Sequence, residues 1–505
     1  MAPDDPAAAA STTRWLFGDQ LGPHFLDALD QPVLLIESRA VFARRRFHRA
    51  KAHLILSAMR HRAVELGEQC TYLQVGTYRE GLDQVSAPLS VCQPTSRVTD
   101  RFVRTLAGER DLTVLEARGF ATSRAEFASW AQGRGRRRLL MEDFYRDARR
   151  RLDVLMDGGE PAGGRWNFDH DNRQPPPRGA RTLGMPEPFR PDEDEIDEQV
   201  RADLDRWQAE GDVRFVGDDG PRRFAATRGE AVAALEDFLA HRLSGFGPHE
   251  DAMLSADPWL AHSLLSAPMN LGLLDPLEAM HRAEQCFRDE EAPIASVEGY
   301  SRQLIGWRDY VWNLYWYLDE DYRDRNELTA RALLPNWLAN LDDSAPEAAC
   351  LRGVLGHLRR NGWVHHIARL MVLGNWLLQH GIDPLAASAW FQRCFVDGYD
   401  WVMIPNVIGM SQHADGGVMA TKPYAAGGAY INRMSDYCSG CRYKPSVRVG
   451  PDACPFTAGY WAFLHAHADR LAANNRMSRA VAGLSRLTDL DELLAQERDR
   501  GTAAP

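Results

Sequence analysis

Four cysteines in the C-terminal half constrain this chain more than any other feature. Cys438 and Cys441 form a Cys-x-x-Cys pair, and Cys454 is followed directly by a proline. Cys350 lies far upstream and would be the fourth ligand. A Cys-x-x-Cys pair places both sulfurs on one side of a tight turn, and a proline after a cysteine leaves the sulfur accessible in cluster loops. We therefore expect these four thiolates to hold one metal centre.

The spacing of these cysteines leaves the identity of the metal open. Zinc binds four thiolates in similar short pairs, and iron-sulfur clusters are also held by four cysteines. A third interpretation is four unrelated thiols in a reducing compartment, where eight cysteines in 505 residues need form no disulfide. The cysteines without a close partner fit small buried apolar residues better. They are Cys70, Cys92, Cys286 and Cys394.

The opening residues and the net charge restrict the expected cellular location and the expected binding partners. Residues 1–5 include two acids, whereas a signal peptide needs a basic start and an apolar run. No apolar run of about 18 residues, enough to span a bilayer, follows. We therefore expect a cytoplasmic protein without a membrane partner. The net charge of −11 argues against a generally basic nucleic-acid binder, although a local basic groove can still bind phosphates.

The N-terminal part predicts an α/β domain with a parallel sheet of the Rossmann-like kind, over residues 12–130. Residues 54–61 have the apolar spacing of a helix. Ligands bind beyond the carboxyl ends of parallel strands, which places Gly18 and Asp19 at the mouth of a candidate pocket. The apolar runs that predict strands are residues 14–21, 32–37, 70–75 and 112–116.

The rest of the chain divides into a connector and a helical domain. Residues 157–195 are rich in glycine, proline, aspartate and arginine and have no sustained apolar period. We assign residues 131–227 to an interdomain linker. From residue 228 to residue 505 the tryptophans and leucines recur at helical spacing, which predicts a large all-α domain.

Several motifs together closely resemble the photolyase and cryptochrome superfamily. They are Glu250-Asp-Ala-Met253, His262-Ser-Leu-Leu-Ser266, Asp397-Gly-Tyr-Asp-Trp401 and Pro405-Asn-Val-Ile-Gly-Met-Ser-Gln412. The segment Asn432-Arg-Met-Ser-Asp-Tyr-Cys-Ser-Gly-Cys441 is similar to the signature of its iron-sulfur bacterial branch, the prokaryotic (6-4) photolyases. The resemblance covers nearly the whole chain. It implies the photolyase architecture and a 4Fe-4S cluster on Cys350, Cys438, Cys441 and Cys454.

The resemblance also implies FAD in the helical domain. Arg369 and Asp397 would then form a buried ion pair beside the isoalloxazine, whereas without the family they would be an ordinary salt bridge between helices. Hydroxyl and amide groups would take the pyrophosphate. The positions that match FAD-binding residues are Ser263, Leu264, Leu265, Ser266, Gln303, Arg308, Arg369, Asn375, Asp397, Met403 and Asn406.

The implied activity is light-driven repair of (6-4) pyrimidine photoproducts, in which excited reduced FAD donates an electron to a lesion flipped out of DNA. His365 and His366 match histidines that give a proton to the lesion, a role that suits an unperturbed pKa of about 6.5. Tyr424 matches a catalytic tyrosine. Without the family, the histidines would be one packed and one exposed residue of a helix, and the tyrosine would be loop packing.

UV-damaged DNA is the implied partner of a monomeric chain. Local cations and one further tyrosine would contact the DNA, and phosphate contacts of this kind make binding salt dependent. The positions expected to contact DNA are Lys422, Tyr430, Arg442 and Lys444.

Some positions depart from the family pattern. Met403 replaces a glutamate expected near flavin N5. Trp390, the expected electron carrier, is kept, but Phe391 and Asp342 replace the tyrosine and the second tryptophan that would relay electrons with it. These changes favour the alternative function, a cryptochrome-like blue-light photosensor without repair activity. Other tryptophans that could carry the electrons are Trp316, Trp337 and Trp376.

The resemblance finally implies an antenna chromophore, 6,7-dimethyl-8-ribityllumazine, held against the N-terminal sheet. Polar residues expected around this pocket are replaced at Val41, Arg44 and Phe47, which leaves the binding of the antenna open. The positions that match the pocket are Phe17, Gly18, Asp19, Glu37 and Ile55.

Overall fold

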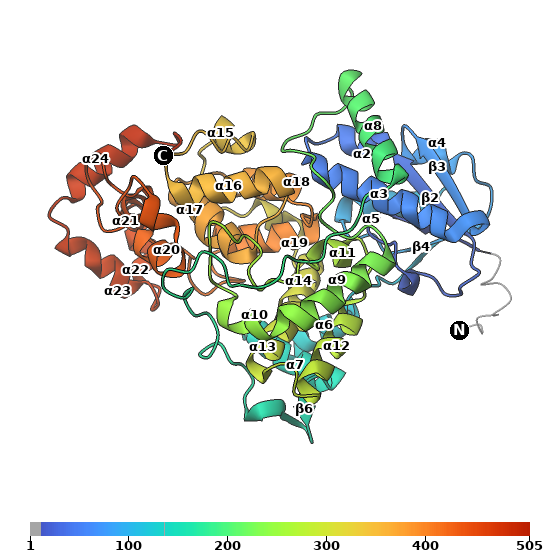
Figure 1. Ribbon diagram of the computed structural model, residues 1–505, viewed down its shortest axis with the longest axis horizontal. Coiled ribbons are helices and arrows are strands. Elements are labelled where there is room, and N and C mark those ends of the chain that lie inside the picture. Colours follow the sequence, from blue (N-terminus) through green and yellow to red (C-terminus); the bar gives the residue numbers. More distant parts are fainter. Residues whose placement is uncertain (1–11, 136) are drawn as a thin grey trace.

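The computed structural model describes residues 12–135 and 137–505 of the chain (Figure 1). The first residues, on which the expectation about export rests, lie outside this range. Among the helices that the structure describes, none is long and apolar enough to cross a membrane.

Five parallel strands form the predicted sheet, in the spatial order β3-β2-β1-β4-β5. All six residues of β2 are buried, as expected where helices cover both faces of a parallel sheet. The α/β prediction is confirmed, with one strand, β4, that the apolar runs did not reveal. Since β4 pairs with the opposite edge of β1, the strand order reverses between these two strands, and ligands bind at such a point. The strands are β1 (Thr13–Leu16), β2 (Val33–Ser38), β3 (Cys70–Val75), β4 (Leu89–Cys92) and β5 (Leu112–Leu115).

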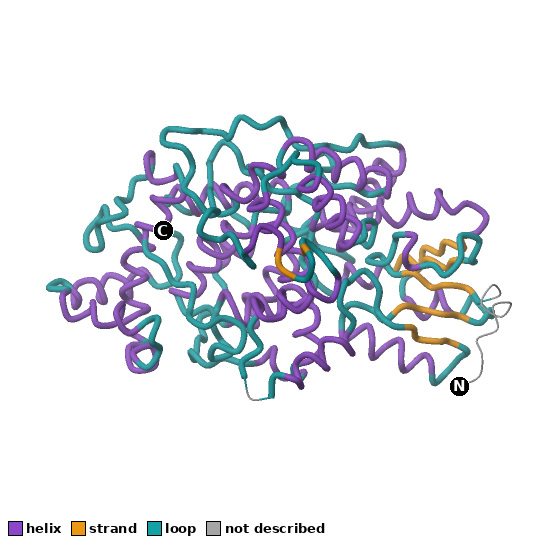
Figure 2. The backbone as a smooth tube through the Cα atoms, turned by 90° about the horizontal axis from the view of Figure 1, so that it is seen from below, coloured by secondary structure: helices purple, strands orange, loops and turns teal. Residues whose placement is uncertain are grey.

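Helix α3 (Arg49–Leu66) lies between the sheet and α8 (Glu195–Ala209). Leu56 of α3 packs in one apolar cluster with Leu204 and Trp207 of α8. Part of the expected linker therefore folds onto the N-terminal domain. Figure 2 shows the sheet confined to one end of the molecule. The other short helices beside the sheet are α2 (Arg39–Ala43), α4 (Tyr78–Leu82) and α5 (Arg97–Ala107).

Most of the remaining described chain is helical, as predicted. The linker also contains α7 (Met141–Leu152) and a short hairpin of β6 (Met156–Asp157) and β7 (Glu160–Pro161). The helices before residue 340 are α6 (Arg124–Gly133), α9 (Arg228–His241), α10 (Leu243–His249), α11 (Ser266–Asn270), α12 (Pro276–Arg288), α13 (Ile294–Ser301), α14 (Asp309–Tyr317) and α15 (Asn336–Ala339). Those after it are α16 (Ala349–Asn361), α17 (Asn375–Gln379), α18 (Pro384–Cys394), α19 (Asp400–Ile404), α20 (Gly428–Met434), α21 (Pro455–Ala466), α22 (Ala468–Ala472), α23 (Ser478–Ala482) and α24 (Leu490–Arg500).

Three helical segments are wound with the wider π-helical pitch. They are Arg302–Arg308, Ala368–Gly374 and Pro405–Ser411. Such turns are rare and occur frequently at functional sites. Each of the three contains a residue expected to bind FAD, which places the unusual backbone at the expected cofactor site.

A buried lysine connects the two domains. Lys51 of α3 donates hydrogen bonds to the carbonyl oxygens of Gln392, at 2.8 Å, and of Gly398. Its ammonium group lies 5.1 Å from the ring centroid of Tyr399. Burial lowers the pKa of Lys51 to about 7. The N-terminal domain thus holds the backbone next to Asp397, one of the expected flavin residues.

Candidate functional site

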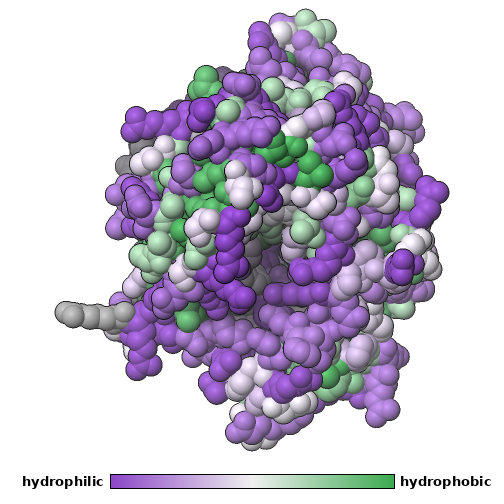
Figure 3. Space-filling model, turned by 90° about the vertical axis from the view of Figure 1, so that its left-hand side faces the viewer, coloured by the Kyte–Doolittle hydropathy of each residue, from purple (hydrophilic) through white to green (hydrophobic). Residues whose placement is uncertain are grey.

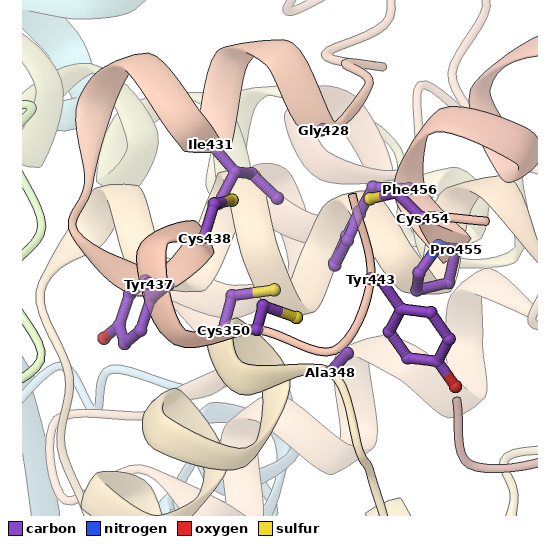
Figure 4. A pocket seen from close by; sticks show the side chains of 11 residues that line it. Ala348, Cys350, Gly428, Ile431, Tyr437, Cys438, Tyr443, Cys454, Pro455 and Phe456 are labelled. Atoms are coloured by element: carbon purple, nitrogen blue, oxygen red, sulfur yellow. The ribbon is translucent and has the colours of Figure 1, made fainter. Parts of the chain in front are cut away.

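The four predicted cysteines come together from three separate elements. Cys350 lies in the first turn of α16, Cys438 and Cys441 lie in or directly after the 3-10 turn Tyr437–Gly440, and Cys454 is the residue before α21. Figure 4 shows the sulfurs of the labelled cysteines facing one space. This cavity has about 300 Å³ of empty volume, and all four cysteines line it. The backbone N–H of Ala349 donates to the Cys441 sulfur at 3.5 Å.

The pKa values of Cys350, Cys438 and Cys454 are raised, first by burial, so these three thiols stay protonated unless a cation is bound. Burial, together with the neighbouring thiols, raises the pKa of Cys350 well above its usual value. The same two causes raise the pKa of Cys438 to about 12. Because metal ligands must be thiolates, a bound cationic centre would reverse these shifts and stabilise the fold at the same time. The donor set therefore fits a metal centre.

The spacing of the thiols bears on which metal centre they fit. Thiolates bind zinc at about 2.3 Å in a tetrahedron, which places the sulfurs of a zinc site about 3.8 Å apart. Among the described residues, the groups of three or more ligand atoms within 4.8 Å of one another contain histidines and acids only. The four thiols therefore stand farther apart than a single zinc ion would draw them.

A second group of predicted residues surrounds Asp397. Arg369 donates two hydrogen bonds to its carboxylate, both at 2.9 Å, and the Ser266 hydroxyl donates a third at 2.6 Å. Burial alone would raise the pKa of Asp397, but Arg369 and Ser266 hold it below its usual value. Asn270 donates to the backbone carbonyl oxygen of Asp397 at 2.9 Å. This network fixes a charged pair inside the helical domain.

Arg308 is buried beside this network. Its guanidinium lies 5.0 Å from the ring centroid of Phe120 and 4.9 Å from that of Trp401, and it donates to the Asn270 amide oxygen at 2.5 Å. Burial lowers the pKa of Arg308 to about 10. Its Nε is buried and has no hydrogen-bond partner among the described residues. A buried donor of this kind suits an anionic or carbonyl group of a cofactor.

The segment before α11 lines a separate small pocket. Ser263 and Leu264 form one wall, and Arg223 and Arg242 face the same space. Leu264 has a φ of 57°, in the left-handed region, so the backbone turns sharply here. Hydroxyl, backbone and guanidinium groups around one cavity suit phosphate. Leu265, by contrast, is buried in the main apolar core.

The remaining predicted cofactor residues have other surroundings. Asn375 exchanges hydrogen bonds with the backbone of Ala426, at 2.8 and 3.1 Å, and so braces the loop before α20. Asn406 donates to the Val402 carbonyl oxygen at 2.8 Å. Met403 is buried in the same apolar cluster as Trp390. Gln303 is half-buried in the first π-helical segment.

The two predicted catalytic histidines meet a third. The ring of His365 stacks on His262 with centroids 4.6 Å apart and planes at 15°, and the ring of His366 lies edge-on to His262 at 5.5 Å. Burial lowers the pKa of His262 and of His365 well below the usual value, so both imidazoles are neutral near pH 7. The His366 side chain is 47% exposed, and its Nε2 lies 3.5 Å from Asp251 Oδ1.

The predicted tyrosines lie on the same side. The pKa of Tyr424 is raised first by burial, and it also responds to the charges of Arg173 and Asp251. The pKa of Tyr430 is raised by burial and then by Asp251. Asp251 therefore lies next to His366 and near enough to Tyr424 and Tyr430 for its charge to act on both. Sequence reasoning gave no role to Asp251 or His262, although both lie in the motifs that carry the family resemblance.

The tryptophans form two unequal arrangements. The ring of Trp390 has Phe391 at 4.9 Å and Phe395 at 6.2 Å, and its Nε1 donates to the Leu338 carbonyl oxygen. Among the described rings, no tryptophan or tyrosine stacks on Trp390, and Trp337 and Trp376 pair with each other at 5.0 Å.

A continuous row of indoles runs elsewhere. Trp401, which contacts Arg308, lies 5.8 Å from Trp312, and Trp312 lies 5.6 Å from the half-buried Trp316. The guanidinium of Arg124 covers the Trp316 ring at 4.6 Å. The row therefore connects the expected cofactor site with the molecular surface.

The N-terminal residues expected to hold an antenna divide into two groups. Gly18 and Asp19 follow β1, at the point where the strand order reverses, and the Thr95 hydroxyl donates to Asp19 at 2.5 Å. A Cβ on Gly18 would lie 3.1 Å from Ile55, so these two residues touch. Burial raises the pKa of Asp19.

The second group has internal partners. The Glu37 carboxylate accepts two hydrogen bonds from Arg60, at 2.9 and 3.0 Å, and one from the Tyr72 hydroxyl. Phe17 packs against Trp15, with ring centroids 4.6 Å apart. The hydrogen bonds from Arg60 and Tyr72 occupy the Glu37 carboxylate, so Glu37 has a structural role in the N-terminal domain.

The cations expected to bind DNA lie on the surface. Arg442 pairs with Glu347, and Lys444 pairs with Asp452 at 2.7 Å, so nearby acids offset their charges. Lys422 is exposed and makes no ion pair with any described residue. Figure 3 shows one face of the molecule, mostly hydrophilic and hollowed near its centre.

Comparisons with known proteins agree with this arrangement. Residues 14–212 match a family model described as deoxyribodipyrimidine photo-lyase-related protein. A (6-4) photolyase of Agrobacterium fabrum is 38% identical over 510 aligned positions, which cover 94% of this chain and 95% of that protein. The crystal structure of a bacterial class III photolyase from Agrobacterium tumefaciens has a TM-score of 0.58 at 15% identity, covering 93% of this chain and 99% of that one. A Synechocystis cryptochrome has a TM-score of 0.53 at 14% identity, covering 79% and 82%.

Proposed function

The chain belongs to the (6-4) photolyase family, and from this we propose that it is a DNA photolyase, a lyase that repairs (6-4) pyrimidine photoproducts in UV-damaged DNA with light. One observation in the structure supports this function most: His366, expected to give a proton to the lesion, lies 3.5 Å from Asp251, whose charge also acts on Tyr424 and Tyr430. FAD, when bound and reduced, supplies the light-driven electron.

The residues around Asp397 would hold the flavin. We propose that the Arg369–Asp397 pair lies beside its ring system, since both charges are fixed by hydrogen bonds and would not rearrange on binding. The cavity of Ser263, Leu264, Arg223 and Arg242 offers the hydrogen-bond donors that a pyrophosphate needs.

His366 is better suited than His365 to pass a proton to the lesion. His365 is buried and its pKa is lowered, so it does not carry an extra proton near neutral pH. The His366 side chain is half exposed, where a flipped base could reach it, and its Nε2 lies 3.5 Å from Asp251 Oδ1. We therefore assign the proton transfer to His366, with His365 and Tyr424 shaping the pocket.

The four cysteines would hold a 4Fe-4S cluster. Two observations support the cluster over zinc: the thiols line a space wider than one ion, and the family resemblance lies in the same segment. Helix α16 carries one ligand of this cavity and lies far upstream of α20 and α21, which carry or wall the rest of it. The cluster therefore has a structural role, joining these elements.

The antenna pocket would lie at the carboxyl end of β1. The contacts of Gly18 with Ile55 and of Asp19 with Thr95 define this place, and 6,7-dimethyl-8-ribityllumazine is the chromophore that the resemblance implies.

Lys422 is the cation with most charge available to phosphate, because Arg442 and Lys444 each face an acid.

Repair itself provides the direct test. Reduced protein incubated under blue light with DNA that contains a (6-4) photoproduct is expected to remove the near-ultraviolet absorbance of the lesion. The same mixture kept in the dark is the control. A stable lesion spectrum in the light would contradict repair and favour a photosensor, the second function, which the replacement of the expected acid by Met403 supports.

The row of indoles gives a prediction about photoreduction. Trp401, Trp312 and Trp316 would relay electrons from an external thiol to the flavin site, in place of the interrupted path at Trp390. Trp316→Phe is expected to slow loss of the oxidised-flavin band under blue light strongly, and Trp390→Phe, the matched control, to leave its rate near that of the wild type. Equal rates in the wild type and Trp316→Phe would assign the relay elsewhere.

A further inference from the structure

Three histidines at the proposed lesion site have the spacing of a metal site. His262, His365 and His366 each bring one ring nitrogen within 4.8 Å of the other two. His262 and His365 are buried, while His366 is half exposed. Three imidazoles with an open fourth position form the ligand set of several catalytic zinc sites.

Two of these rings have unused nitrogen atoms. Nε2 of His262 and Nδ1 of His365 are buried and have no hydrogen-bond partner in the part of the chain that the structure describes. Buried polar atoms in proteins are nearly always paired, so such atoms need an explanation. A neutral imidazole offers a lone pair in its ring plane, which a metal ion can accept. Because the two rings are stacked with their planes at 15°, they would have to tilt out of the stack for both lone pairs to meet at one ion.

Acidic groups next to the histidines would favour a cation. Asp251 Oδ1 lies 3.5 Å from His366 Nε2, and Oε2 of the buried Glu250 has no partner among the described residues. The nearby cations are already paired, Arg173 with Glu250 at 3.1 Å and Arg369 with Asp397 at 2.9 Å. Carboxylates beside histidine ligands commonly complete or orient a metal site.

We propose that His262, His365 and His366 bind a divalent transition-metal ion, Zn2+ by preference, that the carboxylate of Asp251 beside His366 favours the ion, and that this ion blocks repair. Nitrogen ligands with one carboxylate select zinc and its neighbours over magnesium. The inference rests on the proposed function, because the block follows from His366 being the proton donor. Coordination would occupy its nitrogen and fill the space where the lesion must enter.

Cobalt titration of the full-length, cofactor-loaded protein tests the site. Loosely bound metal is first removed with EDTA, and Co2+ is then added. A visible d–d absorption band is expected at wavelengths beyond the flavin and cluster bands, and it should saturate at one Co2+ ion per protein chain. Zn2+ should abolish this band, and Mg2+ should not. His262→Ala should lose it, while His61→Ala, which removes a histidine of a different histidine and acid group, should keep it.

A second variant guards against misfolding. Asp251→Asn keeps the size of the side chain, so it should retain flavin and weaken cobalt binding at least tenfold. A band that persists in both His262→Ala and Asp251→Asn would overturn the site, as would the absence of any band in the wild type.

Inhibition of repair by the metal ion is measured in a separate experiment. Stoichiometric Zn2+ should stop loss of the lesion in the wild type, and EDTA should restore it. Repair at an unchanged rate while Zn2+ occupies the three-histidine site would contradict the proposed inhibition. If the metal-free protein repairs nothing in light, the proposed function fails and the block with it, whereas the cobalt band still decides the metal site.

Discussion

Cys438→Ala should release the C-terminal segment from the helical domain rather than merely slow catalysis. Cys438 lies on the 3-10 turn between α20 and α21, and its thiol faces the cavity that Cys350 of α16 closes from the other side. With one ligand gone the cluster would be lost, and the remaining buried thiols would have no cation to hold them together. Because metal binding to such sites is also folding free energy, we expect a loss of several kcal/mol, on the order seen for structural metal sites.

The measurement combines iron content, thermal unfolding and limited proteolysis. The expected result is loss of iron, a lower melting temperature and cleavage between residues 428 and 505. Cys286→Ala is the matched control, because Cys286 is half-buried in another part of the fold and has no thiol near it. Soluble, flavin-loaded Cys438→Ala protein with normal activity would show that the cluster is dispensable.

His366→Ala should reduce repair by roughly 10²-fold to 10⁴-fold, the usual contribution of a positioned acid or base. The side chain is 47% exposed and is not part of the apolar core, so flavin content and thermal stability are expected to stay at the wild-type level. The measurement is the quantum yield of lesion loss under blue light, together with binding of the lesion-containing DNA in the dark.

His357→Ala is the control for this variant. His357 is a half-buried histidine on α16, and its ring nitrogen meets the Ser255 carbonyl oxygen at 3.4 Å. The His357→Ala variant should repair the lesion at the wild-type rate. Normal repair by His366→Ala would show that the proton comes from another group, and loss of repair only in His365→Ala would move the assignment to the buried ring.

The sequence predicted the architecture because its signals were local. The apolar runs of β2 and β3, separated by the long helix α3, are enough to predict a parallel sheet. β4, Leu89-Ser-Val-Cys92, was missed, although β1 and β5 have the same length and were predicted. The four cysteines were recognisable because their types and spacing carry the chemistry themselves.

The rest of the site depends on contacts that no local pattern contains. The stacking of His262 on His365 and the approach of Trp401 to Trp312 join residues that lie far apart in the sequence. The π-helical turns were also invisible, because one added residue per turn does not change the apolar pattern enough to be seen. Pairing of Lys444 with Asp452 could not be expected from a count of charges.

The buried lysine at the junction has a consequence for how the molecule comes apart. Lys51 belongs to the sheet domain, but its hydrogen bonds go to Gln392 and Gly398 of the helical domain. Separating the two would leave that amine and two carbonyl groups without partners until water reached them, so opening the junction early in unfolding is costly. The α/β domain and the helical domain are therefore expected to unfold as one cooperative unit. Neither domain is expected to fold stably when it is produced without the other.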